Sequence, residues 1–261
     1  MESNPQFDAN GIPRHRTIEV EITSTCDLRC PSCDRFIDVA PAPSMTLNQI
    51  LDFVVESIAL HWRWARIHIL GGEPTLHPQL RDIVELFLSY RAFHPAVKLT
   101  LISNGRGQLK EHRAWLEDRG IKVAVEAKSG GPPLWFHNMR CAPLDIFPEL
   151  SRETLGRPCG NYGIVGCGLG LTRHGYFLCG AGASIARVIG ADIGFLHLAD
   201  ISHAGMLEQA KTLCPPCGHW TDATHGRRYL CDVPQTSPFW DAALAAYAKA
   251  VPPMSLYGKA R

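Results

Sequence analysis

The chain has 261 residues, of which 46% are hydrophobic and 20% are charged, and its formal net charge is +1. This composition is ordinary for a globular protein with a buried core, and the near-neutral charge gives no sign of a nucleic-acid or membrane-surface partner. The first 16 residues are polar, so we expect no signal peptide, and no apolar run reaches the ~20 residues of a membrane span. We therefore expect a cytoplasmic protein.

The first two-thirds of the chain alternates patterns that are typical of strands and helices. We expect strands at residues 17–23, 65–70, 97–103, 121–127 and 134–141. We expect helices at residues 45–60, 79–90 and 109–120. Thr46 and Gln49 form a capping-box pattern at the start of the first helix, and Gly120 is placed to end the third.

Strands that alternate with helices at this spacing predict a parallel sheet of βαβ units. We expect an α/β fold, a partial (β/α)₆ barrel of the TIM type, in which the loops after the strands meet at one face. Past residue 150 the helical pattern fades, and Gly and Cys become frequent around a hairpin that turns near residues 173–175. The expected organisation is an N-terminal extension (1–16), a core (17–150), a small Cys-rich domain (151–238), and a last helix with a tail (239–261).

Three cysteines follow the first expected strand in the spacing Cys-x₃-Cys-x₂-Cys, at Cys26, Cys30 and Cys33. Clustered cysteines in a reducing compartment usually bind metal or do chemistry. Three thiolates can hold three irons of a [4Fe–4S] cluster and leave the fourth iron open to another ligand. The alternatives are plain thiols, or a zinc site with a fourth ligand such as Asp34 or His15.

Two more motifs follow the second and third expected strands. In "GGEP" (71–74) the glycines let the backbone approach a ligand closely, and Glu73 can pair with an ammonium group. "SNG" (103–105) ends the third strand. Because loops after parallel strands share one face of a barrel, we expect both motifs to meet the cysteine loop there.

In the order and spacing of these motifs, residues 17–145 resemble the radical S-adenosylmethionine (SAM) superfamily. The resemblance implies that SAM binds the open iron and yields a 5′-deoxyadenosyl radical, and that an electron donor such as flavodoxin or ferredoxin supplies the electron. Ser32 stands where the family often has an aromatic residue, so we expect no ring packing on adenine there. The implied SAM contacts are Gly71, Gly72, Glu73, Ser103 and Asn104.

The later cysteines predict a second site. Their order, with Gly175 in the hairpin, resembles the SPASM and twitch domains, which bind auxiliary [4Fe–4S] clusters. The resemblance implies one such cluster on Cys179, Cys214 and Cys217, with Cys167 or Cys159 as fourth ligand. A zinc site that includes His219 and Cys231 is the alternative.

The resemblance implies an enzyme that oxidises a small molecule, with the second cluster as electron acceptor, because twitch enzymes of this size include dehydrogenases of aminocyclitol-type substrates. A maturase for a ribosomally made peptide and a non-catalytic metal-binding protein are the alternatives. No catalytic residue is assigned. Asn138 and Arg140 share a face of the fifth expected strand, where a guanidinium would suit an anionic substrate or form an ordinary ion pair. "GAGA" (180–183) is too weak for a phosphate loop.

Overall fold

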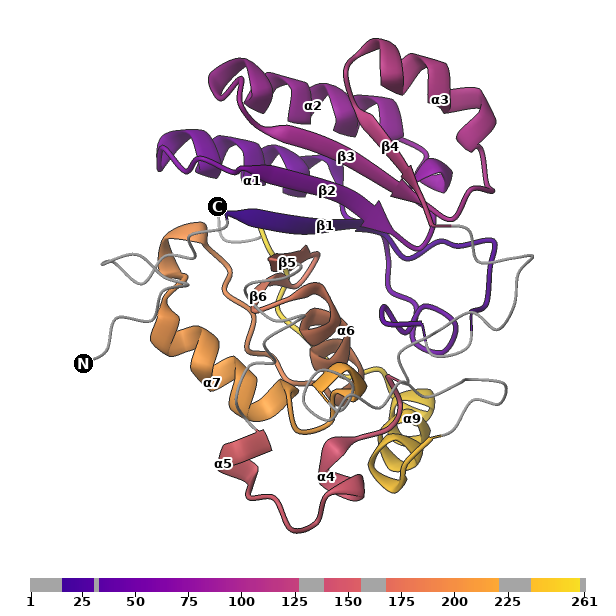
Figure 1. Cartoon of the computed structure of the whole chain (residues 1–261), viewed down its shortest axis with the longest axis vertical. Helices are drawn as coiled ribbons and strands as arrows, with labels where there is room; N and C mark the ends of the chain where they lie inside the picture. The colour runs from indigo at the N-terminus through magenta and orange to yellow at the C-terminus, as the bar shows by residue number, and fades with distance from the viewer. Residues whose placement is uncertain (1–15, 31–32, 127–138, 156–167, 221–235, 259–261) are drawn as a thin grey trace.

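The computed structural model describes residues 16–30, 33–126, 139–155, 168–220 and 236–258. They contain one six-stranded sheet in the order β4-β3-β2-β1-β5-β6 (Figure 1). Neighbouring strands are parallel except β5 and β6, which form an antiparallel hairpin. The sheet does not close, so the expected α/β fold with a partial barrel is confirmed. The strands are β1 (Thr17–Thr23), β2 (Arg66–Gly71), β3 (Lys98–Ser103), β4 (Lys122–Val125), β5 (Leu169–Thr172) and β6 (Gly175–Phe177).

The helices of the described residues lie on two sides of this sheet. The first three cover one side of β1–β4, and α6, α7 and α9 lie on the opposite side (Figure 1). None of these helices combines the length and apolar character that a bilayer crossing needs. The helices are α1 (Leu47–Ala59), α2 (Leu80–Phe93), α3 (Leu109–Asp118), α4 (Pro143–Ile146), α5 (Arg152–Leu155), α6 (Gly180–Ile189), α7 (His203–Leu213) and α9 (Pro238–Lys249), with 3₁₀ turns at Pro74–Leu76 and Leu198–Asp200.

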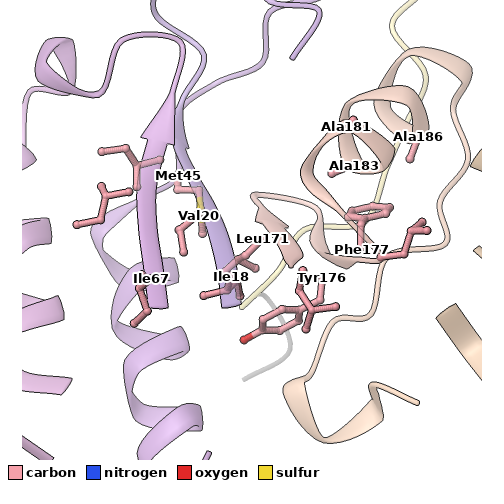
Figure 2. Close-up of a cluster of buried hydrophobic side chains, with 14 of the residues drawn as sticks. Ile18, Val20, Met45, Ile67, Leu171, Tyr176, Phe177, Ala181, Ala183 and Ala186 are labelled. Carbon is pink, nitrogen blue, oxygen red and sulfur yellow. The ribbon is translucent and has the colours of Figure 1, made fainter. Parts of the chain in front are cut away.

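The two faces of β1 differ in chemistry because successive side chains of a strand point in opposite directions. Ile18, Val20 and Ile22 are buried in the apolar core, and Figure 2 shows Ile18 and Val20 in a cluster with Met45 and Leu171. Glu19 and Glu21 are also buried, and they pair with arginines that come from outside the strand. The polar face of β1 therefore holds buried ion pairs, which link the sheet to the segments that cover it.

Most elements lie where the sequence predicts them, including the capping box of Thr46 and Gln49 and the left-handed Gly120 after α3. The expected fifth strand is wrong at residues 139–141, which form a turn and a bend; its other residues, 134–138, lie outside the described residues. Instead of a strand ladder, the Arg140 carbonyl accepts from Ser237 N at 2.8 Å, and Pro143 begins α4 three residues later.

Candidate functional site

The loops after β1, β2 and β3 meet at the carboxyl edge of the sheet, as the sequence predicts. Gly72 N donates to Thr23 O, and Glu73 N donates to Thr25 O, both at 2.8 Å. A Cβ at Gly72 would lie 2.4 Å from Thr25 O and 2.8 Å from Cys26 Cβ. Only glycine permits this approach, so "GGEP" lies directly along the backbone that leads into the cysteine loop.

Glu73 is fully buried, and its carboxylate connects "GGEP" to "SNG". One oxygen accepts from Thr75 N at 3.1 Å and from Thr75 Oγ1 at 2.6 Å. Ser103 Oγ lies 3.0 Å from both oxygens, and Asn104 N donates to the other at 2.8 Å. These neutral donors compensate the burial of the charge, so Glu73 fixes the shape of both loops in this structure.

Asn104 connects "SNG" to the cysteine loop. Its Nδ2 lies 2.8 Å from Asp27 Oδ1 and 3.8 Å from Cys26 Sγ. Gly107 N donates to the second oxygen of Asp27 at 3.0 Å. Partial burial alone would raise the pKa of Asp27, but these two hydrogen bonds lower it overall. The carboxylate of Asp27 therefore stays ionised and ties the two loops together.

The thiols of the cysteine loop differ in their surroundings. Cys26 Sγ accepts from Leu28 N at 3.4 Å, although burial, the largest effect, raises the pKa of Cys26. Cys33 lies deeper, and burial, followed by the charge of Asp34, raises its pKa to about 12. Iron is bound by thiolates, so metal binding at this loop would release protons from these groups.

The donor set of this loop fits a [4Fe–4S] cluster. Three soft thiol ligands lie on one short segment, and the amides of Leu28 and Asn104 are already directed at the sulfur of Cys26. No group of three or more His, Cys, Asp or Glu side chains in the described ranges is arranged to hold a single metal ion. The assignment of Cys26, Cys30 and Cys33 as ligands therefore stays a prediction from the sequence.

The second set of cysteines lies around the start of α6 and the end of α7. Cys179 caps α6, and its Sγ accepts from Gly182 N at 3.3 Å. A Cβ at Gly182 would lie 3.4 Å from both Cys179 Sγ and Leu213 Cδ1, so the segment that leads into Cys214 passes close to Cys179. Cys167 and Cys159, the candidates for the fourth ligand, lie outside the described residues, as does Cys231.

Two residues from other parts of the chain donate hydrogen bonds to the turn that carries Cys214 and Cys217. Leu144 N donates to Pro215 O at 3.1 Å, and Trp240 Nε1 donates to Pro216 O at 2.8 Å. His219, two residues beyond the turn, has its Nε2 4.0 Å from Asp34 Oδ2. Because Asp34 directly follows Cys33, this contact places the two cysteine segments side by side.

Arg140 and Asn138 were the sequence candidates for contact with a substrate. Arg140 is buried and forms an ion pair with Asp38, which is the ordinary structural role that the sequence left open. Asn138 lies outside the described residues. Asp27 and Arg35 are site residues that the sequence motifs do not predict. Each is a charged residue within two positions of a motif cysteine, and this proximity was the available signal.

Comparisons with known proteins find a matching family model and similar solved structures. The family model of the radical SAM superfamily matches residues 20–132. The chain is similar to a crystal structure of BtrN in complex with AdoMet and 2-DOIA, with 18% identity over 86% of this chain and 97% of that chain and a TM-score of 0.50. It is also similar to SeMet BtrN in an open conformation, with 21% identity over 83% and 90% of the two chains and a TM-score of 0.46. No curated protein matches the sequence. At these identities the structural likeness concerns the fold alone.

Proposed function

From the premise that residues 20–132 of this chain are a radical SAM domain, we propose that the protein is an enzyme that oxidises a small-molecule substrate. The proposal includes a SAM-binding [4Fe–4S] cluster on Cys26, Cys30 and Cys33. It also includes a second [4Fe–4S] cluster on Cys179, Cys214 and Cys217, which serves as electron acceptor. Cys167 or Cys159 would supply the fourth ligand of that cluster.

One observation carries this proposal: the segment after Cys33 contacts residues that lie next to the second set of cysteines in the chain. Asp34 lies 4.0 Å from His219, next to the Cys214–Cys217 turn. Arg35 reaches Gly180, the residue after Cys179. A site that generates a substrate radical and a site that removes an electron from it need to be neighbours, and these contacts support that arrangement.

When bound, SAM and a cluster held by Cys26, Cys30 and Cys33 would supply a 5′-deoxyadenosyl radical for hydrogen abstraction, and a cluster held by Cys179, Cys214 and Cys217 would supply an acceptor for one electron. The residues of the chain set the geometry for this chemistry. Asn104 and Asp27 tie "SNG" to the cysteine loop, and Glu73 ties "SNG" to "GGEP". The three loops that would contact SAM therefore form one connected rim.

The structural neighbour BtrN suggests which substrate to test first. BtrN was crystallised with AdoMet and 2-DOIA, and the shared fold supports SAM as the cofactor of this chain. We take 2-DOIA as the first compound to test. A product lighter by two hydrogen atoms, formed together with 5′-deoxyadenosine, would identify the reaction as an oxidation, whereas SAM cleavage that leaves every tested small molecule intact would contradict it.

The experiment that tests the cofactor set compares wild type with the Cys26/Cys30/Cys33→Ala triple variant after anaerobic purification. We expect about eight irons per chain in wild type and about four in the variant, with [4Fe–4S] Mössbauer spectra in both. SAM cleavage with dithionite should be lost in the variant. About four irons per chain in wild type and none in the variant would mean that the protein has no second cluster to accept the electron. SAM cleavage retained in the variant would overturn the assignment of the first site.

A further inference from the structure

Residues 34–38, directly after Cys33, form a bridge segment between the first cysteine loop and the C-terminal half of the chain. The segment is buried for most of its length, and Phe36 has a left-handed φ of +51°, which is unfavourable for this residue type. Such a backbone persists where packing fixes it. Its partners from the C-terminal half are His219 for Asp34, Arg187 and Gly180 for Arg35, Trp240 for Phe36, and Arg140 for Asp38.

Arg35 is the buried charge of this segment. Its side chain is 9% exposed, and its Nη2 donates to Glu19 Oε2 at 2.7 Å. Its Nε lies 3.7 Å from Asp34 Oδ1. Its remaining terminal nitrogen, Nη1, is buried and has no hydrogen-bond partner among the residues that the structure describes. Because a buried donor without an acceptor is destabilising, an acceptor placed at Nη1 would be stabilising.

The position of Nη1 is fixed by Gly180. A Cβ at Gly180 would lie 1.8 Å from Arg35 Nη1 and 2.5 Å from Glu19 Oε2, so the guanidinium lies against the backbone of the first residue of α6. That residue directly follows Cys179, which caps the helix. The donor without an acceptor is therefore next to a predicted ligand of the second cluster, and only glycine leaves room for it there.

We propose that Arg35 Nη1 donates a hydrogen bond to a sulfur of the cluster held by Cys179, Cys214 and Cys217. This inference rests on the second cluster of the proposed function. The sulfurs of a [4Fe–4S] cluster carry negative charge, and hydrogen bonds to them are one determinant of its reduction potential. A guanidinium donor stabilises the more negative reduced state most strongly, so Arg35 raises the potential of the second cluster and favours its role as acceptor.

The test uses the Cys26/Cys30/Cys33→Ala background, which isolates the second cluster. A redox titration followed by EPR gives its potential with and without Arg35→Met. We expect Arg35→Met to shift the one-electron equilibrium about tenfold toward the oxidised cluster, which is ~59 mV to lower potential. Arg119→Met is the matched control, because Arg119 pairs with Glu85 and lies over Trp115 at the surface of α3. It should leave the potential unchanged.

A second variant covers the case in which Arg35→Met does not fold. Glu19→Gln keeps the donor but removes its compensating charge, and it should raise the potential. A potential that stays at the control value in either folded variant overturns the hydrogen bond while the cluster itself stands. A background protein without iron overturns the second cluster and this inference together. A shift found only in the first cluster, measured in Cys214/Cys217→Ala, would contradict the assignment to the second site.

Discussion

Phe36 and Trp240 pack with their ring centroids 4.7 Å apart, which joins the segment after Cys33 to the last helix of the chain. Both side chains are fully buried. The indole of Trp240 also donates to Pro216 O, inside the turn between Cys214 and Cys217. One residue near the C-terminus therefore touches the surroundings of both cysteine sites, and changes there should affect both.

We expect Trp240→Ala to lower the free energy of unfolding by about 3–5 kcal/mol, because it empties a large buried site. Trp240→Phe keeps most of the packing but leaves Pro216 O without its donor, at a cost of about 1–3 kcal/mol. Urea denaturation of the apoprotein measures both values, and iron content measures the effect on the sites. Trp115→Ala, at a partly buried surface position, is the control. Equal losses in Trp240→Ala and Trp115→Ala would contradict the prediction.

Glu73→Gln should weaken SAM binding about 10- to 100-fold, in line with the loss of supporting contacts around other metal sites. The amide nitrogen of Gln cannot accept the hydrogen bonds that Thr75, Ser103 and Asn104 now give to both oxygens, so the rim loosens. Equilibrium dialysis of SAM against the reconstituted protein measures the affinity. Glu85→Gln, at an exposed ion pair with Arg119, should leave it unchanged. Unaltered affinity in Glu73→Gln would show that the rim does not depend on this carboxylate.

Gly72→Ala should lower the iron content of the first site, because the new methyl group would overlap Thr25 O and the Cβ of Cys26. The cysteine loop has to move to make room for it. Gly120→Ala is a useful comparison, since its φ of +66° makes alanine unfavourable there by about 1 kcal/mol, but it lies far from the cysteines. We expect lower stability with full iron in Gly120→Ala. Full iron in Gly72→Ala would mean that the loop tolerates the displacement.

His77 makes the stability of the protein dependent on pH. Burial lowers its pKa below the ordinary 6.5, and the hydrogen bond of its Nε2 to Met45 O offsets this only in part. As the pH falls below about 6.5 the unfolded chain takes up this proton first. The contribution of His77 to stability is therefore complete above this pH and is lost as the pH falls toward the lower pKa of the folded state.

Urea midpoints at pH 7.5 and pH 5.5 test this dependence. His77→Gln should reduce the difference between the two midpoints without removing it, because burial also lowers the pKa of His68 and His174. His61→Asn is the control, since His61 is exposed and asparagine tolerates its φ of +51°. If the urea midpoint changes equally between pH 7.5 and pH 5.5 in His77→Gln and in wild type, groups other than His77 cause the pH dependence.

The parts of the fold that follow local periodicity were predictable from the sequence. The strand at residues 17–23 and the helix that opens at Thr46 depend on alternation and capping, which neighbouring residues encode. Helix α6 was missed although Ser184 and Arg187 lie at helical spacing, because it begins with Gly180 and Gly182, and glycine is a poor helix former. Helix α7 was missed although Ser202 caps it and Met206, Gln209, Ala210 and Leu213 are buried at helical spacing.

The candidate site was predictable only in part, for a different reason. The meeting of three loops follows from the rule that parallel strands end at the same edge, and it is confirmed. The contact of Asn104 with Asp27 and the approach of Arg35 to Gly180 join residues far apart in the chain. Such contacts depend on the orientation of side chains after packing, which neither periodicity nor motif spacing encodes.

The central place of β1 in the sheet determines the order in which the chain can assemble. One edge of β1 pairs with β2, but Ile18 on its other edge pairs with Leu169, which is synthesised much later. A nascent chain can therefore build β1–β4 while the second edge of β1 is still open, and open edges invite pairing with other chains. Closing so long a loop is slow. The cysteine-rich half thus completes the sheet last, and during synthesis the protein depends on protection of an edge that the finished fold hides.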